Sequence, residues 1–352
     1  MLFNVSKEHL PKAFRLAEMV RDELVQLCSQ NSDVALHVIP GKSEKGKSID
    51  GFVLGNGSRS ISLIAGSHSD EPVGPETLRV LVKELLENRK HYAKLLETYC
   101  LLIIPQVNPD GEERNWQWAK FWPDLSEYLK HAFRELPGRD LEFGYPSMRV
   151  ENTAVAEFLR KYSPIELHVS LHGMAFSEGA MLLIDRDWIN RTDQLRQNFV
   201  QHAKKAGLQL HSHDRAGEKG FDYIAPGFTT TPRGRAMQDY FLAQDDAETA
   251  QKFHLSSMEF VRDLGGDPLC LVTELPLFLL QNSGDLKPGV PENYLAFRLI
   301  KPELQQRAFA GEQLDDILKR FRLRSLDLPL AIAIQLQVIE EGINAADAAQ
   351  GA

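Results

Sequence analysis

Apolar and polar residues follow two different periods along this chain, and these periods predict the order of its elements. Residues 10–29 place apolar side chains at helical spacing with charges on the other face, so we expect a helix there. Two strands follow at 34–39 and 49–54. The Gly-Asn-Gly-Ser sequence at 55–58 then predicts a hairpin turn into a third strand at 60–65.

Downstream, short apolar runs alternate with helical patterns. We expect helices at 75–90, 154–161, 190–205 and 244–263, and strands at 99–107, 165–171, 180–184, 208–211 and 269–273. Strands that alternate with helices usually form parallel sheets that are covered on both faces. The pattern therefore predicts an α/β fold with a mixed, largely parallel twisted sheet and helices on both faces. Ligands of such sheets gather beyond the ends of the strands.

The C-terminal part has a different pattern. Residues 302–349 are helical in pattern and rich in Leu, Ile and Ala, with a break near Leu328-Pro329. We therefore expect a main domain at 1–285 and a helical extension at 286–352. The extension either packs on the main domain or forms the contact of a homo-oligomer.

Composition excludes several functional classes. With 43% hydrophobic and 25% charged residues, the chain is typical of soluble globular proteins, and its net charge of −9 argues against a nucleic-acid partner. No apolar stretch reaches the roughly 18 residues of a membrane-spanning helix, and the N-terminus lacks the pattern of a secretory signal. Three cysteines, Cys28, Cys100 and Cys270, lie far apart in apolar surroundings, so we expect free thiols and a cytoplasmic protein.

One small set of residues is typical of a metal site. His68 and Glu71 lie three residues apart, where the apolar run 61–65 meets a polar turn, and His172 follows another apolar run far along the chain. Zn²⁺ prefers imidazole and carboxylate ligands, and catalytic zinc sites gather ligands from distant segments while keeping one position open. An H-x-x-E pair also arises by chance, so other residues have to support it.

Two further motifs follow predicted strands. The Asn-Pro-Asp-Gly motif at 108–111 is in isolation typical of a plain turn. Three residues later, Arg114 can hydrogen-bond a carbonyl oxygen beside a metal site. Glu274 ends the apolar run 269–273, where its carboxylate either emerges into solvent or takes a proton from water.

In order and context, these motifs resemble the zinc carboxypeptidases of the carboxypeptidase A type over residues 50–280. The resemblance implies that one zinc ion is bound by three residues: His68, Glu71 and His172. It also implies that Arg114 polarises the substrate carbonyl and that Glu274 is the general base. Asp140 lies in a segment like the one that orients the first histidine ligand in that family, so it would hold His68 in its tautomer.

The sequence departs from the family where the substrate binds. The usual Asn-Arg pair for a terminal carboxylate corresponds to Glu142-Phe143, which replaces a cation with an aromatic ring and adds negative charge. The usual pocket tyrosine has no counterpart in 256–262. A glycine-rich polar segment at 217–235 is long enough to form a wall or lid. We take four residues as candidate substrate-binding residues: Glu142, Tyr145, Arg233 and Arg235.

The two arginines carry a specific hypothesis. Arg233 and Arg235 would replace the missing carboxylate clamp, and the alternative is that both are solvated surface residues.

Other histidines are less informative. His168 shares a strand face with His172 and is better explained as a hydrogen-bonded sheet residue. A second metal at 211–214 has no supporting motif, so we expect a single ion.

We interpret the chain as a zinc-dependent hydrolase, a metallopeptidase that uses water to cleave an amide bond of a peptide or peptide-like substrate. A first alternative is an N-acyl amino acid deacylase of the aspartoacylase type, against which the motif at 108–111 weighs. A second is a non-catalytic metal-binding scaffold, against which Glu274 weighs, because a structural metal needs no general base. The expected partner is a peptide or an acylated amino acid, without nucleic acid or membrane.

Overall fold

The middle strands of the sheet are apolar on both faces. In β3 (Arg59–Ala65), Ile61 and Leu63 belong to one buried cluster and Ile64 to another, because neighbouring side chains of a strand point to opposite faces. β4 (Tyr99–Ile104) divides its apolar residues in the same way. Strands of this kind require a covering layer on each side.

The computed structural model describes residues 2–3, 5, 8, 10–281 and 287–350. These residues form a sheet in the order β1-β2-β4-β3-β5-β10-β6-β9-β8, with β7 beside β6 and β11 beside β10. The other strands are β1 (Ala35–Lys42), β2 (Ser48–Leu54), β5 (Ile165–Ser177), β6 (Gly179–Ile184), β7 (Gln209–Leu210), β8 (Tyr223–Ala225), β9 (Phe228–Thr230), β10 (Leu269–Leu279) and β11 (Arg324–Ser325). β4, β3, β5 and β10 run parallel, and antiparallel pairs flank them. The expected mixed α/β fold is confirmed.

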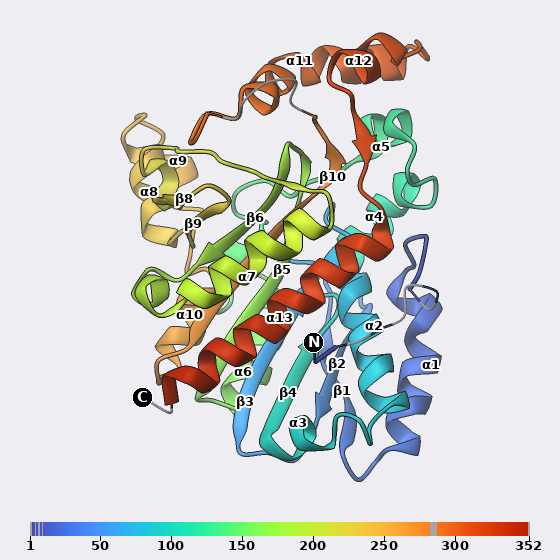
Figure 1. Ribbon diagram of the computed structural model, residues 1–352, viewed down its shortest axis with the longest axis vertical. Helices are drawn as coiled ribbons and strands as arrows, with labels where there is room; N and C mark the ends of the chain where they lie inside the picture. Colours follow the sequence, from blue (N-terminus) through green and yellow to red (C-terminus); the bar gives the residue numbers. More distant parts are fainter. Residues whose placement is uncertain (1, 4, 6–7, 9, 282–286, 351–352) are drawn as a thin grey trace.

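Helices cover both faces of this sheet (Figure 1). They are α1 (Ala17–Gln30), α2 (Val73–Glu87), α3 (Ala93–Thr98), α4 (Pro109–Ala119), α5 (Leu125–His131), α6 (Val150–Lys161), α7 (Asp193–Lys205), α8 (Gly234–Leu242), α9 (Ala247–Ala250), α10 (Ser257–Asp263), α11 (Glu292–Phe309), α12 (Asp315–Arg320) and α13 (Leu328–Gln350). α13 packs between α2 and α7 on one face, while α6 and α10 contribute to the core on the other. α11 and α12 lie together at one end of the molecule (Figure 1).

The Gly-Asn-Gly-Ser sequence at 55–58 does not form the expected hairpin. β4 lies between β2 and β3, so the two strands joined by this turn are not paired. A Cβ atom at Gly55 would lie 2.3 Å from the carbonyl oxygen of Tyr99, and one at Gly57 would lie 2.0 Å from the backbone of Thr98. The glycines are therefore needed because the turn passes directly against the start of β4.

Two strands are longer than expected, and this changes where two candidate site residues lie within them. β5 continues to Ser177 and β10 continues to Leu279. His172 and Glu274 therefore lie inside the strands and not at their ends, as partners in the parallel register. The expected strands ended at these two residues because polar side chains interrupt the apolar pattern there. The backbone pairing between β5 and β10 continues beyond them.

The strand expected at 99–107 ends at Ile104, and some helix boundaries also differ from the expected ones. The first helix begins at Ala17, because the preceding irregular segment carries Phe14 into the core. The helical pattern at 244–263 divides into α9 and α10, since Asp246 and Ser256 each cap a separate helix. α2, α6 and α7 confirm the helices expected in their regions.

The C-terminal helix is tied to the middle of the sheet by a buried glutamine. α13 begins at Leu328, where the sequence pattern broke, and contacts β5 and β10. Its Gln335 accepts a hydrogen bond from Thr77 Oγ1 of α2 at 2.6 Å. The same amide donates to the carbonyl oxygen of His172 at 3.2 Å and to Thr273 Oγ1 at 3.0 Å. One side chain thus joins α2, α13, β5 and β10.

Two expectations from composition are tested by the fold. No helix in the described part of the chain combines the length and apolar character that crossing a bilayer requires. All three cysteines are unpaired, which confirms the expected free thiols. Cys28 and Cys270 are buried, whereas Cys100 is partly exposed.

Replacing Gln335 with Ala should lower the free energy of unfolding by about 3 kcal/mol, because it leaves buried polar atoms without partners and opens a small cavity. Urea unfolding followed by circular dichroism measures the change. Gln337→Ala, in the same helix at a partly exposed position, is the matched control and should change this free energy by less than about 0.5 kcal/mol. Equal losses in the two variants would contradict the bridging role of Gln335.

Candidate active site

A glycine sets the position of the loop that carries His68 and Glu71 from β3 to α2. A Cβ atom at Gly74 would lie 2.5 Å from the carbonyl oxygen of Leu171 in β5, so glycine allows α2 to start directly against that strand. This approach lets Glu71 Oε2 accept a hydrogen bond from the backbone N–H of Gly173 at 3.1 Å. The carboxylate is therefore held at the strand that carries His172.

The Asn-Pro-Asp-Gly motif is the N-terminus of α4 and not a plain turn. Asn108 caps the helix by accepting a hydrogen bond from the N–H of Gly111 at 3.0 Å, and proline occupies the first helical position. The Asn108 amide also donates to Glu135. Glu135 in turn accepts a hydrogen bond from Ser69 Oγ at 2.9 Å. The motif thus anchors the loop that contains His68.

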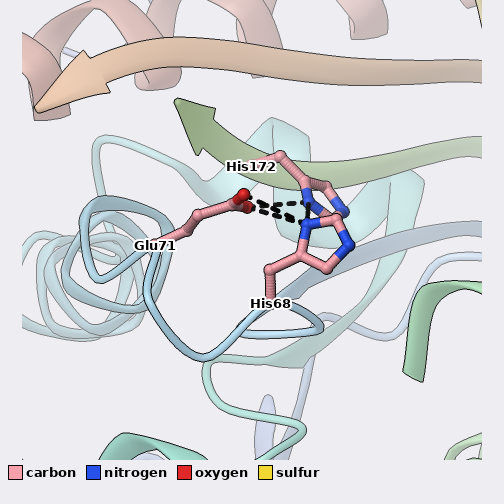
Figure 2. A group of neighbouring side chains, drawn as sticks. All are labelled: His68, Glu71 and His172. Atoms are coloured by element: carbon pink, nitrogen blue, oxygen red, sulfur yellow. Dashed lines mark hydrogen bonds and ion pairs between the residues drawn. The ribbon is translucent and has the colours of Figure 1, made fainter. Parts of the chain in front are cut away.

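Three side chains from two remote segments point toward one another (Figure 2). The Nδ1 atoms of His68 and His172 are 2.8 Å apart, and Glu71 Oε2 lies 3.1 Å from the first and 2.9 Å from the second. Within the described residues, these form the one group of three or more possible ligands, with ligand atoms within 4.8 Å of one another. Ligand atoms of a tetrahedral zinc centre with bonds near 2 Å lie about 3.3 Å apart, so a small outward shift would accommodate the ion.

Each imidazole is held by a second carboxylate on its outer nitrogen. Nε2 of His68 lies 3.3 Å from Asp140 Oδ1. Nε2 of His172 lies 3.1 Å from Glu142 Oε2 and 2.9 Å from Ser170 Oγ. When Nε2–H donates to these oxygens, Nδ1 of each ring is left with a lone pair that can bind a cation.

Glu142 lies behind His172, contrary to the expectation that it contacts the substrate. Its side chain is buried and accepts hydrogen bonds from the backbone N–H and the hydroxyl of Ser257. Although burial opposes the charged form, hydrogen bonds from His172 and Ser257 hold the pKa of Glu142 below its ordinary value. The negative charge that the sequence adds at this position therefore orients a histidine.

The carboxylates and imidazoles of the site stabilise each other's charges. Burial and Arg134 oppose the charged form of His68, yet the carboxylates of Glu71 and Asp140 raise its pKa well above the ordinary value. For His172, burial and the charge on His68 are outweighed by Glu71 and its other carboxylate partner, which raise the pKa to about 9. The group thus favours positive charge, which either protons or a metal cation supply.

Glu274 adds a further carboxylate from β10. Its Oε2 atom is buried and has no hydrogen-bond partner in the described part of the chain. Burial and the negative charge of Glu71 raise the pKa of Glu274 to about 8. A buried polar atom without a partner needs an explanation, and a bound cation with its water molecule provides one. The His-Glu-His ligand set and this unpartnered carboxylate both fit zinc.

Arg114 is not in the site. It lies on the exposed side of α4, where its guanidinium carbon is 3.3 Å from the ring centroid of Phe133. The residue after that phenylalanine, Arg134, enters the site instead, with Nη1 2.8 Å from Asp70 Oδ1 and 2.6 Å from Glu71 Oε1. No sequence motif indicated Arg134, because it lies in an irregular segment after α5.

A cavity of about 530 Å³ opens beside these residues. Its lining combines carboxylates, aromatic rings, methionines and cations. The lining includes His68, Glu71, Arg134, Asp140, Phe143, Met174, Phe176, Arg215, Lys219, Phe221, Glu274, Tyr294, Phe297, Arg298 and Lys301. The segment 217–235 forms part of the wall, through Lys219 and Phe221. Helix α11 supplies four lining residues that sequence patterns did not indicate.

Three other candidate substrate residues do not line this cavity. Tyr145 is buried and stacks on Phe260 with ring centroids 5.4 Å apart, in the core behind the sheet. Arg233 and Arg235 are exposed, and Arg235 pairs with Asp239 at 2.8 Å. The structure therefore does not place the expected arginine clamp at this cavity, because α8 begins at Gly234 and both arginines at its start are exposed.

His168 and His211 each have a structural partner on Nδ1. His168 Nδ1 lies 3.1 Å from Ser62 Oγ and its Nε2 lies 3.2 Å from Ser257 Oγ, so it is the expected hydrogen-bonded sheet residue. Burial lowers the pKa of His168 to about 4, which keeps the ring neutral. His211 Nδ1 pairs with Glu178 Oε2 at 3.0 Å, away from the metal-ligand group.

The family is decided by sequence comparison. A sequence model described as zinc carboxypeptidase matches residues 20–263, most of the chain. The chain belongs to the zinc carboxypeptidase family. Its fold agrees, since carboxypeptidase A from Helicoverpa armigera superposes with a TM-score of 0.56 over 99% of this chain and 78% of that one, at 13% identity. The resemblance inferred from the motifs is confirmed.

Relatives of this zinc carboxypeptidase differ in what their names state about activity. Carboxypeptidase 2 of Trichophyton rubrum is 30% identical over 190 residues, which cover 50% of this chain and 32% of that protein. Inactive metallocarboxypeptidase ecm14 of Talaromyces stipitatus is 29% identical over 119 residues, which cover 30% of this chain and 20% of that protein. The chain thus spans about a third or less of the length of these two relatives. Family membership leaves the activity to be argued from the site.

Replacing Glu142 with Gln should weaken zinc binding about 10- to 100-fold, because carboxylates behind histidine ligands fix the ring and raise its basicity. Competition with a chromophoric chelator measures the Kd. Glu178→Gln alters another buried carboxylate–histidine pair, outside the site, and as matched control should leave the Kd within about twofold. A zinc Kd that does not respond to Glu142→Gln would show that this carboxylate has no orienting role.

Proposed function

We propose that this zinc carboxypeptidase is an active hydrolase that cleaves an amide bond of a peptide or peptide-like substrate. The unpartnered carboxylate of Glu274 carries the proposal. It lines the same cavity as His68 and Glu71 and its Oε2 atom is buried without a hydrogen bond from any described residue. A metal that only stabilises the fold needs no such group, whereas hydrolysis needs a base.

The metal would be held by His68, Glu71 and His172. When bound, zinc supplies a Lewis acid that polarises the substrate carbonyl and increases the acidity of water. Asp140 and Glu142 keep the two imidazoles in the tautomer that presents Nδ1 to the ion. Side chains of the cavity would carry out proton transfer and stabilise the oxyanion.

Glu274 would take a proton from the attacking water and give it to the leaving nitrogen. The pKa of about 8 applies without a bound cation, and the positive charge of an ion beside Glu71 lowers the pKa, because it favours the carboxylate. The carboxylate form that a base requires is then populated at neutral pH. Phe143, Met174 and Phe176 give the cavity lining an apolar part beside this carboxylate.

Arg134 would stabilise the oxyanion formed when water attacks the carbonyl. Its guanidinium lies at the ligand group, bonded to Asp70 and Glu71 through Nη1. The other nitrogens of a guanidinium remain available as donors, since the group carries five N–H bonds. This role was expected of Arg114, which lies outside the cavity lining.

Glu274→Gln should lower kcat for a cleaved peptide about 100- to 10,000-fold while zinc stays bound, because the amide cannot take the proton. Hydrolysis of a panel of peptides and N-acyl amino acids, with metal analysis of each protein, measures both effects. Glu178→Gln should retain the wild-type rate. If Glu274→Gln hydrolysed the substrate at the wild-type rate, Glu274 would not be the general base.

The same panel separates the alternatives. Cleavage of N-acyl amino acids without any cleavage of peptides would favour the deacylase. A wild-type protein that binds zinc and cleaves no member of the panel would favour the non-catalytic scaffold.

A cytoplasmic location remains part of the proposal and is consistent with the three unpaired cysteines.

Arg134→Ala should lower kcat/KM about 100-fold, because it removes charged donors at the developing oxyanion. Arg114→Ala is the matched control on the exposed side of α4, and it should change kcat/KM by less than about threefold. Steady-state kinetics on the best peptide of the panel gives both values. A loss confined to Arg114→Ala would restore the role first assigned to that residue.

A further inference from the structure

The cavity that contains the metal ligands also receives cations from the C-terminal part of the chain. Arg298 and Lys301 lie three residues apart on α11, so both project from the same side of that helix. Arg215, in the loop after β7, lines the same cavity. The family model ends at residue 263, so the two α11 cations lie outside the part of the chain that it matches. We refer to Arg215, Arg298 and Lys301 as the cationic wall.

None of the three cations has a hydrogen-bond or ion-pair partner within the described residues. Arg215 lies over the ring of Phe221 at 4.4 Å, and Lys301 Nζ lies 5.9 Å from the ring centroid of Phe176. By contrast, Arg307 near the other end of α11 pairs with Asp316 at 2.8 Å. Like charges in one partly enclosed cavity repel each other, and a bound anion removes this cost.

Two carboxylates of the cavity lining already have basic partners. Asp70 pairs with Arg134 at 2.8 Å, and Asp140 lies 3.3 Å from His68. Burial outweighs the attraction of Asp70 and lowers the pKa of Lys301, so this ammonium gains from an additional anionic partner. The lining thus has an acidic end, which holds the metal ligands, and a cationic wall whose three side chains form no ion pair with the residues that the structure describes.

The usual place for binding a substrate carboxylate is apolar in this chain. Phe143, at the position where the family usually has an arginine, packs edge-on against Phe253 with centroids 5.7 Å apart. Its neighbour Glu142 is buried behind His172. Neither residue can supply a cation.

We propose that the cationic wall binds a carboxylate of the substrate, so that this enzyme acts on anionic peptides or anionic acyl amino acids. The inference rests on the proposed function, because it assigns the wall to the substrate of the same site. Arginine and lysine recognise carboxylates through charge-assisted hydrogen bonds. The carboxylate belongs to the C-terminus of the substrate or to an acidic side chain, and matched ligands distinguish these two sources.

The test measures binding without turnover. Full-length, zinc-loaded protein carrying Glu274→Gln is titrated by calorimetry with two matched pairs of ligands. Acetyl-Phe-Ala and its C-terminal amide differ only in a terminal carboxylate, whereas acetyl-Glu-Ala-amide and acetyl-Gln-Ala-amide differ only in a side-chain carboxylate. We expect the acid of at least one pair to bind at least about tenfold more tightly than its neutral partner. The pair that shows this preference identifies the source of the carboxylate.

Adding Arg298→Ala and Lys301→Ala to the same protein should reduce that preference at least about tenfold, while the neutral ligand of the pair binds within about threefold of its former Kd. Any contribution of zinc to carboxylate binding is present in both proteins and cancels. Arg298→Lys with Lys301→Arg keeps the charges and should retain the preference. Arg233→Ala with Arg235→Ala removes two exposed arginines outside the cavity and should also retain it.

Failure of this inference differs from failure of the proposed function. No preference for either acid, including no measurable binding, overturns the cationic wall as a substrate site. A preference that survives the loss of Arg298 and Lys301 overturns it too. If the preference depends on these two residues but the wild-type protein cleaves no substrate, anion binding by the cationic wall is supported and only the proposed hydrolytic function is contradicted.

Discussion

The site depends on the mutual compensation of buried opposite charges. Removing the carboxylates of Glu71, Asp140 and Glu142 from water is costly, and so is burying two imidazolium rings. Each outer imidazole nitrogen lies near one of these carboxylates, and the inner nitrogens face Glu71. A charge arrangement of this kind retains positive charge at its centre, and a divalent cation supplies that charge without requiring the rings to be protonated.

The sheet determines where these groups meet. β3, β5 and β10 are parallel neighbours, so His172 and Glu274 are adjacent partners across the ladder, and the loop after β3 opens beside them. Gly74 allows α2 to begin against β5, and Gln335 of α13 bonds the backbone of His172. Positions in the centre of a packed sheet are rigid, which is what a metal site with an accurately placed base requires.

The C-terminal part of the chain contributes to the cavity as well as covering the sheet. α11 adds two aromatic rings, Tyr294 and Phe297, and two cations to a cavity whose metal ligands come from residues 68–172. Among family relatives, at least one is named inactive, so the fold is compatible with loss of catalysis. In this chain, Glu274 and Arg134 at the ligand group support the proposed activity, and the replacement of the usual carboxylate clamp supports the proposed preference for an anionic substrate.

Local periodicity in the sequence was enough to predict the α/β class, and motifs that resemble those of the zinc carboxypeptidases were enough to predict the three convergent ligands and Asp140. The sequence misplaced Arg114, Arg233 and Arg235, since the direction of a side chain on a short helix depends on what packs against it. The role of Glu142 was decided only by tertiary structure, which buries it behind a histidine from a remote strand. Arg134, Arg215, Arg298 and Lys301 had no motif at all. Contacts between segments far apart in the chain leave no local pattern, so only the folded arrangement of strands and helices identified these residues.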